Sequence, residues 1–324
     1  MRRHLAARAL ACGLLVAGVL TTPPGLAGQA ATRPAGARAP GIDAEQLRTH
    51  VRVLADDSMG GRRTGSEGNE RARRYIERVF AAIGASPIGA SFVHPFTFES
   101  RSGTVRGVNV VARIAGSERP DRVIVITAHY DHLGERNGQI FNGADDNASG
   151  VAAMLALAHV FAASPPRHTI VFAALDAEES GLRGAHAFVQ DPPLPLASIA
   201  LNINLDMVGR NDAGELWVAG THHTPALRPT VERLAADVPV RLRIGHDRPG
   251  VPGQDDWTGS SDHGAFHARG IPFLYFGVED HADYHKESDE FAGIDPDFQL
   301  RAARTIAAIV IALDGGLEVI LPRR

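Results

Sequence analysis

Apolar residues recur along the chain in two patterns, and each pattern predicts one kind of secondary-structure element. Leu47, Val51 and Leu54 repeat at the three-and-four-residue spacing of a helix face. Short apolar runs elsewhere are typical of buried strands. We therefore expect helices at 43–56, 66–83, 149–162, 180–190, 225–236, 262–268 and 296–313. We expect strands at 91–98, 107–114, 122–128, 169–175, 198–205, 215–219, 239–244 and 271–276.

From residue 122 onward the expected strands and helices largely alternate, and several of the strands are continuously apolar. Such strands are buried on both faces, as in α/β proteins whose sheet is covered by helices. We predict a single α/β domain over 43–324, with a mixed, mostly parallel β-sheet sandwiched by helices. Its length of about 280 residues is enough for one large hydrophobic core.

The first thirty residues differ from the rest of the chain. Arg2, Arg3 and Arg8 precede a short apolar run, and small residues follow as far as Ala30. This order indicates a signal peptide over 1–30, and hence an exported protein that is periplasmic or secreted. A membrane anchor is the alternative, but the run is short for a span of about 20 residues; a lipoprotein site at Cys12 is a weaker one.

Residues 31–42 are rich in Ala, Pro and Gly and are expected to form a flexible lead-in. After signal cleavage we expect no integral membrane segment.

The chain has 33 basic and 37 acidic residues, a formal net charge of −4, which argues against a nucleic-acid partner. The sequence does not reveal the oligomeric state.

Polar residues cluster just after three expected strands. They are His129-Tyr130-Asp131-His132, Asp176-Ala177-Glu178-Glu179, and Asp206. In open α/β sheets, sites lie beyond the carboxyl ends of the strands, so neighbouring strands would bring these groups into one cleft. Two further segments join them: GADDNASG at 143–150 and DYHKESD at 283–289.

Several carboxylates in one cleft repel one another unless a cation neutralises them, and imidazole with carboxylate ligands suits zinc. Two histidines and three acids fit two metals that share a bridging carboxylate better than they fit one. Helix capping could account for Asp145 or Asn147 alone, but not for the whole group. A serine nucleophile would need a Gly-x-Ser-x-Gly turn, which the sequence lacks. The glycine-rich stretch at 60–68 follows a helix, so it is a poor phosphate loop.

These motifs resemble metallopeptidase family twenty-eight, the co-catalytic di-zinc peptidases that include bacterial leucyl aminopeptidases and glutamate carboxypeptidase II. The resemblance runs from about residue 43 to the C-terminus. Its motifs, in the family's order, are TAHYDH (127–132), GADDNASG (143–150), DAEESGLRGA (176–185), NLDMVG (204–209), SSDHGAFHARGIP (260–272) and DYHKESD (283–289). It implies the zinc-peptidase fold, also called phosphorylase/hydrolase-like, and two Zn²⁺ per chain.

The resemblance also implies a role for each site residue. One zinc would be held by His129, Asp146 and Asp206, and the other by Asp146, Glu179 and His285. Glu178 matches the general base, which takes a proton from metal-activated water. Asp131 matches the acid that supports His129 through its second ring nitrogen, and Tyr284 resembles an oxyanion-stabilising tyrosine of some relatives. Asp262 and His263 receive no metal role, and His222 and His223 are expected on the surface.

The expected activity is that of an exported metallo-aminopeptidase acting on peptide substrates. A related di-zinc carboxypeptidase or dipeptidase, a one-zinc glutaminyl cyclase, and a non-catalytic receptor domain are the alternatives. The complete ligand set favours the two-metal hydrolases. An aminopeptidase needs an acid for the substrate's α-amine, and Asp280, Asp283 and Asp289 are not separable by sequence. The preferred N-terminal residue, and the choice among zinc, cobalt and manganese, stay open.

Overall fold

The computed structural model describes residues 41–101 and 103–323. The predicted signal peptide (1–30) and all but the last two residues of the predicted lead-in (31–42) lie outside these residues. Ile42, at the start of the described part, already packs in the hydrophobic core.

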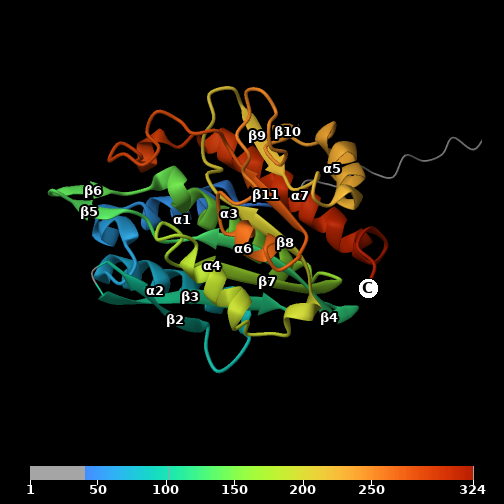
Figure 1. Cartoon of the computed structure of the whole chain (residues 1–324), viewed down its shortest axis with the longest axis horizontal. Coiled ribbons are helices and arrows are strands. Elements are labelled where there is room, and N and C mark those ends of the chain that lie inside the picture. The colour runs from blue at the N-terminus through green and yellow to red at the C-terminus, as the bar shows by residue number, and fades with distance from the viewer. Residues whose placement is uncertain (1–40, 102, 324) are drawn as a thin grey trace, which may run out of the picture. The chain divides into compact units, whose positions relative to one another are not determined.

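A nine-stranded mixed sheet forms the centre of the domain (Figure 1). Its strands are β1 (Ser86–Pro87), β2 (Val93–Ser100), β3 (Gly103–Ile114), β4 (Arg119–His129), β7 (His168–Leu175), β8 (Ile199–Leu205), β9 (Glu215–Ala219), β10 (Arg241–Ile244) and β11 (Phe273–Gly277). The order is β1-β3-β7-β4-β8-β11-β9-β10, with β2 paired to β3. β7, β4, β8 and β11 run parallel, whereas β3 and β9 are antiparallel to their neighbours β7 and β11. A separate hairpin pairs β5 (Gly134–Arg136) with β6 (Gln139–Phe141).

Helices cover both faces of this sheet. They are α1 (Ala44–Leu54), α2 (Glu67–Ala82), α3 (Gly150–Ala163), α4 (Arg183–Gln190), α5 (Arg228–Ala235), α6 (His263–His267) and α7 (Pro296–Ile320). Short helical turns are η1 (Asp57–Arg62), η2 (Ala144–Ser149), η3 (Leu196–Ser198), η4 (Pro225–Leu227) and η5 (Phe291–Gly293). Caps explain several helix starts, because the side chains of Asp43, Ser66 and Asp295 accept backbone N–H groups at α1, α2 and α7.

The two faces bury different residues because side chains alternate along a strand. Ile124 and Ile126 of β4 join the larger core, under α1, α2, α3, α5 and α7. Val123 and Val125 face the opposite side, under α4 and α6. This arrangement confirms the predicted fold class of a single α/β domain with a mixed sheet between helices.

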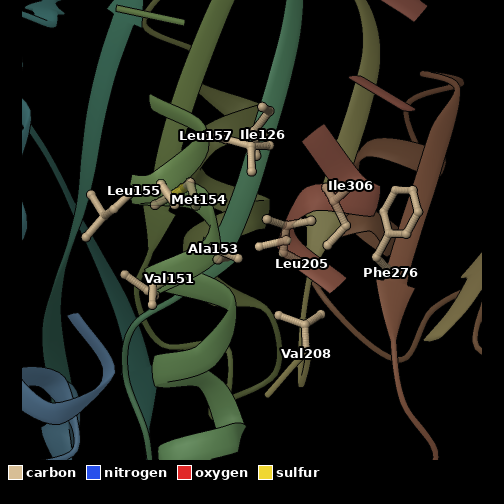
Figure 2. Close-up of a cluster of buried hydrophobic side chains, with 14 of the residues drawn as sticks. Ile126, Val151, Ala153, Met154, Leu155, Leu157, Leu205, Val208, Phe276 and Ile306 are labelled. Carbon is tan, nitrogen blue, oxygen red and sulfur yellow. The ribbon is translucent and has the colours of Figure 1, made fainter. Parts of the chain in front are cut away.

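Helix α3 lies in the middle of the larger core, where Val151, Met154 and Leu157 pack near Ile126 and Leu205 (Figure 2). Within the described residues, the segment Ala144–Ala163 is the one helix long and apolar enough to cross a membrane, and 78% of the window that qualifies is buried inside the domain. A helix that is buried to this extent is a core helix of the folded domain.

Most predicted elements appear at their expected places. Helix α4 begins at Arg183 and not at 180, because 177–182 form a turn in which Ala177 and Leu182 have positive φ. Helix α7 continues to Ile320, beyond the predicted end at 313. The carboxyl ends of the neighbouring strands β7, β4 and β8 meet at one edge of the sheet, as predicted.

Candidate metal centre

The first group of candidate ligands lies at this edge. Nε2 of His129 is 3.2 Å from Oδ1 of Asp206 and 3.3 Å from Oδ1 of Asp146. Ligands of a tetrahedral zinc, each about 2.0–2.1 Å from the ion, are separated by about 3.3 Å. His129, Asp146 and Asp206 therefore stand at the spacing of three ligands of one ion, and all three are buried.

A second group lies on the other side of Asp146. Nε2 of His285 is 3.1 Å from Oδ2 of Asp146 and 3.4 Å from Oε2 of Glu179. These separations also match the distance between two ligand atoms of one tetrahedral zinc ion. Since Oδ1 of Asp146 faces His129 and Oδ2 faces His285, one carboxylate serves both groups, and the residues fit a pair of cations that share it.

The electrostatics of the second group favour a positive charge. Hydrogen bonds to Asp146 and Glu179 raise the pKa of His285 to about 10. A metal ion would replace that proton, because a histidine ligand must be deprotonated. The donor set of imidazole and carboxylate groups suits zinc.

Asp146 is positioned by the chain around it. It lies in η2, just before α3, and the carboxylate of Asp289 accepts the backbone N–H groups of Asp145 and Asp146 at 3.0–3.1 Å. The side chain of Asp145 points elsewhere: it accepts the N–H of Gly209 at 2.7 Å and lies 3.1 Å from Nε2 of His281. The structure thus places Asp146, and not Asp145, between the two groups.

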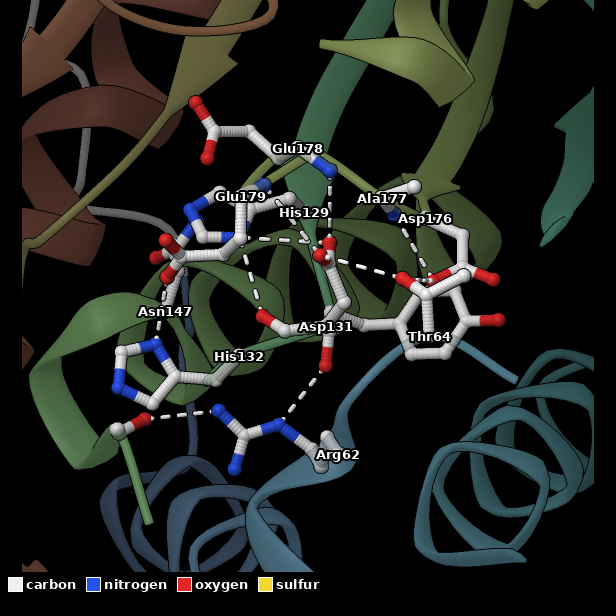
Figure 3. Close-up of polar contacts among 12 residues, drawn as sticks. Arg62, Thr64, His129, Asp131, His132, Asn147, Asp176, Ala177, Glu178 and Glu179 are labelled. Atoms are coloured by element: carbon white, nitrogen blue, oxygen red, sulfur yellow. Dashed lines mark hydrogen bonds and ion pairs between the residues drawn. The ribbon is translucent and has the colours of Figure 1, made fainter. Parts of the chain in front are cut away.

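Arg62 supports the same edge of the sheet from behind, and sequence reasoning missed it. Its fully buried guanidinium donates to the carbonyls of Leu54, Tyr130, Asn142 and Gly143. Burial lowers the pKa of Arg62 to about 10, against the opposing effect of nearby carboxylates, foremost Asp146. Figure 3 shows the side chain reaching from η1 to the segment after β4. It therefore ties the segments that carry His129 and Asp146 to one another.

Asp131 contacts a different partner from the one expected. Nδ1 of His129 lies 3.2 Å from the backbone carbonyl of Asp131, whereas its distance to Oδ1 of that carboxylate is 3.8 Å. The carboxylate instead accepts the N–H of Glu178 at 3.0 Å and that of Glu179 at 3.4 Å. The side chain of Asp131 thus positions the Glu178–Glu179 turn, and its backbone orients His129. Burial raises the pKa of Asp131 well above its usual range.

Glu178 and Glu179 diverge from this turn. The carboxylate of Glu179 lies between His132 and His285. The carboxylate of Glu178 points away from Asp131 (Figure 3), and no protein donor reaches it among residues 41–101 and 103–323. Burial raises the pKa of Glu178 well above its usual range, while the nearby His129 opposes the shift.

Two tyrosines lie near the metal centre. The half-buried ring of Tyr284 stacks on His285, with 3.9 Å between ring centroids. Tyr275, on β11, was not predicted. Burial raises the pKa of its hydroxyl well above the usual range, and the carboxylates of Asp206, Asp146 and Glu178 add to the shift. A tyrosine hydroxyl can donate a hydrogen bond as well as accept one.

Two further residues stand in the motifs of the sequence analysis but were given no role there. Asp262 is fully buried beside His129 and Asp206, and within the described chain neither of its carboxylate oxygens has a hydrogen-bond partner. Burial raises the pKa of Asp262 to about 7. His132 lies against Glu179 and Asp146, so that these three residues also meet the spacing of a metal site. In the sequence, only its position three residues after His129 indicated that His132 lies near the metal centre.

The fold and this site define a class of α/β proteins with a metal centre at the carboxyl edge of a mixed sheet. Within that class, the chain belongs to peptidase family M28, whose model matches residues 109–310. A probable zinc metalloprotease of Pyrenophora teres f. teres is 40% identical over 222 residues, covering 60% of this chain and 47% of that protein. The chain thus spans about half the length of this relative.

Solved structures share the fold. A zinc aminopeptidase from Bacillus subtilis superposes with a TM-score of 0.69 at 18% identity, covering 84% of this chain and 96% of its own. A glutaminyl cyclase from Fimbriiglobus ruber gives a TM-score of 0.67 at 20% identity, covering 85% of this chain and 97% of its own. At such identities the likeness establishes the fold and leaves the reaction open.

Proposed function

We propose that this protein is an exported zinc aminopeptidase that hydrolyses N-terminal residues from peptides with two Zn²⁺ per chain. The observation that carries the proposal is the position of Asp146, whose two oxygens each face a histidine–carboxylate group at the spacing of tetrahedral ligands. His129 and Asp206 would complete one metal site, and Glu179 and His285 the other.

Bound zinc would supply a Lewis acid for the scissile carbonyl and lower the pKa of water. Glu178 is the general base in this proposal: its carboxylate is half-buried, borders the centre and has no protein donor in the described chain. It takes a proton from the attacking water and delivers it to the leaving amine. Tyr284 donates a hydrogen bond to the carbonyl oxygen as negative charge develops there.

The α-amine of a peptide needs a carboxylate that is not already engaged. Asp283 pairs with Arg210 and Ser288, and Asp289 is buried against the η2 turn. Asp280 has no hydrogen-bond partner among the residues that the structure describes, and it lies near His285 and Asp146. We assign amine recognition to Asp280.

Three substrate classes test the activity. The protein is purified from residue 31, its metal content is measured, and hydrolysis is compared for aminoacyl-nitroanilides, N-acetylated peptides and a peptide with N-terminal glutamine. We expect two zinc ions per chain and turnover of the unblocked substrates. Cleavage confined to blocked peptides would contradict the aminopeptidase proposal. Ring closure of the glutamine peptide without hydrolysis would establish the cyclase, whose fold this chain also shares.

The export proposal rests on the amino-terminal sequence pattern. N-terminal sequencing of the protein recovered outside the cytoplasm should show a chain that begins near residue 31. Recovery of the intact chain from the cytoplasm alone would contradict export.

A further inference from the structure

His132 occupies a position that the proposed ligand set does not explain. Its ring is fully buried, and Nδ1 lies 2.7 Å from Oε1 of Glu179. Nε2 is buried too and has no hydrogen-bond partner in the described residues. The ring packs against Gly143, where a Cβ would overlap it. The side chain is therefore held in place with one nitrogen directed at a candidate metal ligand.

The distances distinguish a ligand from a hydrogen-bond donor. Two ligand atoms of one tetrahedral zinc lie about 3.3 Å apart, whereas charge-assisted N–H···O contacts are about 2.7–2.9 Å. His132 stands 2.7 Å from Glu179, and its distance to Oδ2 of Asp146 is 3.7 Å. His285 stands 3.1 and 3.4 Å from the same two carboxylates. The separations of His285 suit coordination, and that of His132 suits a hydrogen bond.

The tautomer supports the same assignment. A neutral histidine carries one proton, on Nδ1 or on Nε2. If Nδ1 bound a metal, the proton would be on Nε2, where no acceptor lies among the described residues. Nε2 has no partner among the described residues in either tautomer, so the contact at Nδ1 decides between them. With the proton on Nδ1, the 2.7 Å contact becomes a donor–acceptor pair, and the buried Nε2 carries no proton.

We propose that His132 is a positioning residue that donates Nδ1–H to Oε1 of Glu179 and so directs Oε2 to the metal shared with Asp146 and His285. The inference rests on the proposed two-metal function. A free carboxylate can rotate and bind an ion through either oxygen or through both. A fixed donor on one oxygen removes this freedom, and partners of this kind change metal affinity by about 10–100-fold.

Two matched substitutions test the inference. Asn places its amide N–H₂ close to where histidine has Nδ1, whereas Gln, of similar size and polarity, places it close to where histidine has Nε2. We expect His132→Asn to keep wild-type binding of both metals. We expect His132→Gln to weaken the second metal by about 10–100-fold while the first stays bound. Zinc affinity is measured by titration against a chelator, and the absorption spectrum of the Co²⁺-loaded protein reports the coordination of each site.

Each outcome has one meaning. Equal loss of the second metal in both variants, with an altered Co²⁺ spectrum, would show that His132 is a ligand and overturn the inference. Wild-type binding in both variants would show that the hydrogen bond is irrelevant and also overturn it. Circular dichroism confirms that each variant is folded. If the wild-type protein itself binds fewer than two ions, the proposed two-metal function fails, independently of His132.

Discussion

At the scale of single residues, the backbone separates two adjacent glutamates into different environments. Ala177 has a φ of 60°, and the next two N–H groups both point to Asp131. The turn sends Glu179 toward His132 and His285, while Glu178 keeps a carboxylate without a protein donor in the described chain. The two side chains can therefore be tested separately, although they are neighbours in the sequence.

Replacing Glu178 by Gln should leave metal binding intact and reduce turnover. The amide keeps the size of the side chain but cannot accept a proton, so kcat should fall by about 10²–10⁴-fold. Steady-state kinetics and metal analysis of the same sample measure both effects. Full activity in Glu178→Gln would remove this residue from the role of general base.

Asp145 and Asp146 provide a matched pair. Asp146→Asn removes the one carboxylate that faces both His129 and His285, so we expect loss of bound metal. Asp145→Asn keeps an oxygen that can accept the N–H of Gly209, and its side chain points away from both histidine groups, so we expect both metals to remain. Elemental analysis of the two variant proteins measures how much metal each retains. If Asp145→Asn loses metal and Asp146→Asn retains it, the assignment within this motif is reversed.

The sequence was sufficient to nominate the candidate ligands but not the residues that support them. His129, Asp146 and Asp206 stand in motifs whose residue types and order are recognisable. Arg62 occurs in a polar, glycine-rich stretch that looks like an exposed loop. It is buried because four backbone carbonyls converge on it, one from the end of α1 and three from two segments that are distant in the sequence. Convergence of this kind depends on tertiary structure, and no local pattern predicts it.

At the scale of elements, the turn η2 depends on the glycine before it. Gly143 has a φ of 53°, and a Cβ there would overlap the carbonyl of Asp146 and the ring of His132. Gly138, in the β5–β6 turn, has a φ of 77° but only open space around the same position. The two glycines therefore share a left-handed backbone and differ in what surrounds them.

This difference gives an element-level prediction. Gly138→Ala should cost about 1 kcal/mol of stability, from the backbone conformation alone, and leave metal affinity unchanged. Gly143→Ala should cost more and weaken metal binding, because Asp146 and His132 must shift to admit the methyl group. Thermal unfolding and zinc titration measure the two effects. Equal behaviour of the two variants would show that the contacts at Gly143 do not matter.

Most of the helices and strands could be predicted, because burial of one face imposes a periodic pattern of apolar residues on the sequence. The helices α1 and α2 and the strands β4, β7 and β8 lie within a few residues of their predicted bounds. Residues 180–182, the end of the turn after β7, were predicted as the start of a helix, because a leucine at 182 gives no local sign of the positive φ that it adopts. The extension of α7 to Ile320 passes through Gly315 and Gly316, residues that usually end a helix. In both places tertiary contacts outweigh local preference.

At the scale of the whole domain, alternate residues of β4 face opposite cores, so both layers of helices depend on the same strand. The larger core also buries His50, which accepts or donates a 2.7 Å hydrogen bond with Tyr75 through Nδ1. Burial lowers the pKa of His50 to about 4, and the nearby His159 adds to the shift. The histidine is therefore neutral in the folded protein near pH 7.

The sign of the resulting pH dependence follows from linkage. An unfolded histidine has a pKa of about 6.5. Below this pH the unfolded chain therefore binds a proton at residue 50, whereas His50 of the folded protein stays neutral. Stability from this residue is complete above pH 6.5 and is lost as the pH falls toward 4. A shift of this size corresponds to a loss on the order of 3 kcal/mol. His263, whose pKa burial lowers to about 3, acts in the same direction.

Replacing His50 by Asn isolates this contribution, because the amide can still bond Tyr75 but does not titrate. Urea unfolding of both proteins between pH 7.5 and about 4.5 gives the difference in unfolding free energy at each pH. Contributions from metal binding and from His263 occur in both proteins and cancel in that difference. We expect the wild type to be more stable at neutral pH and the gap to narrow steadily below pH 6.5. A gap that stays constant across this range would mean that His50 titrates alike in the folded and unfolded chains, and that its burial does not control the acid sensitivity of the core.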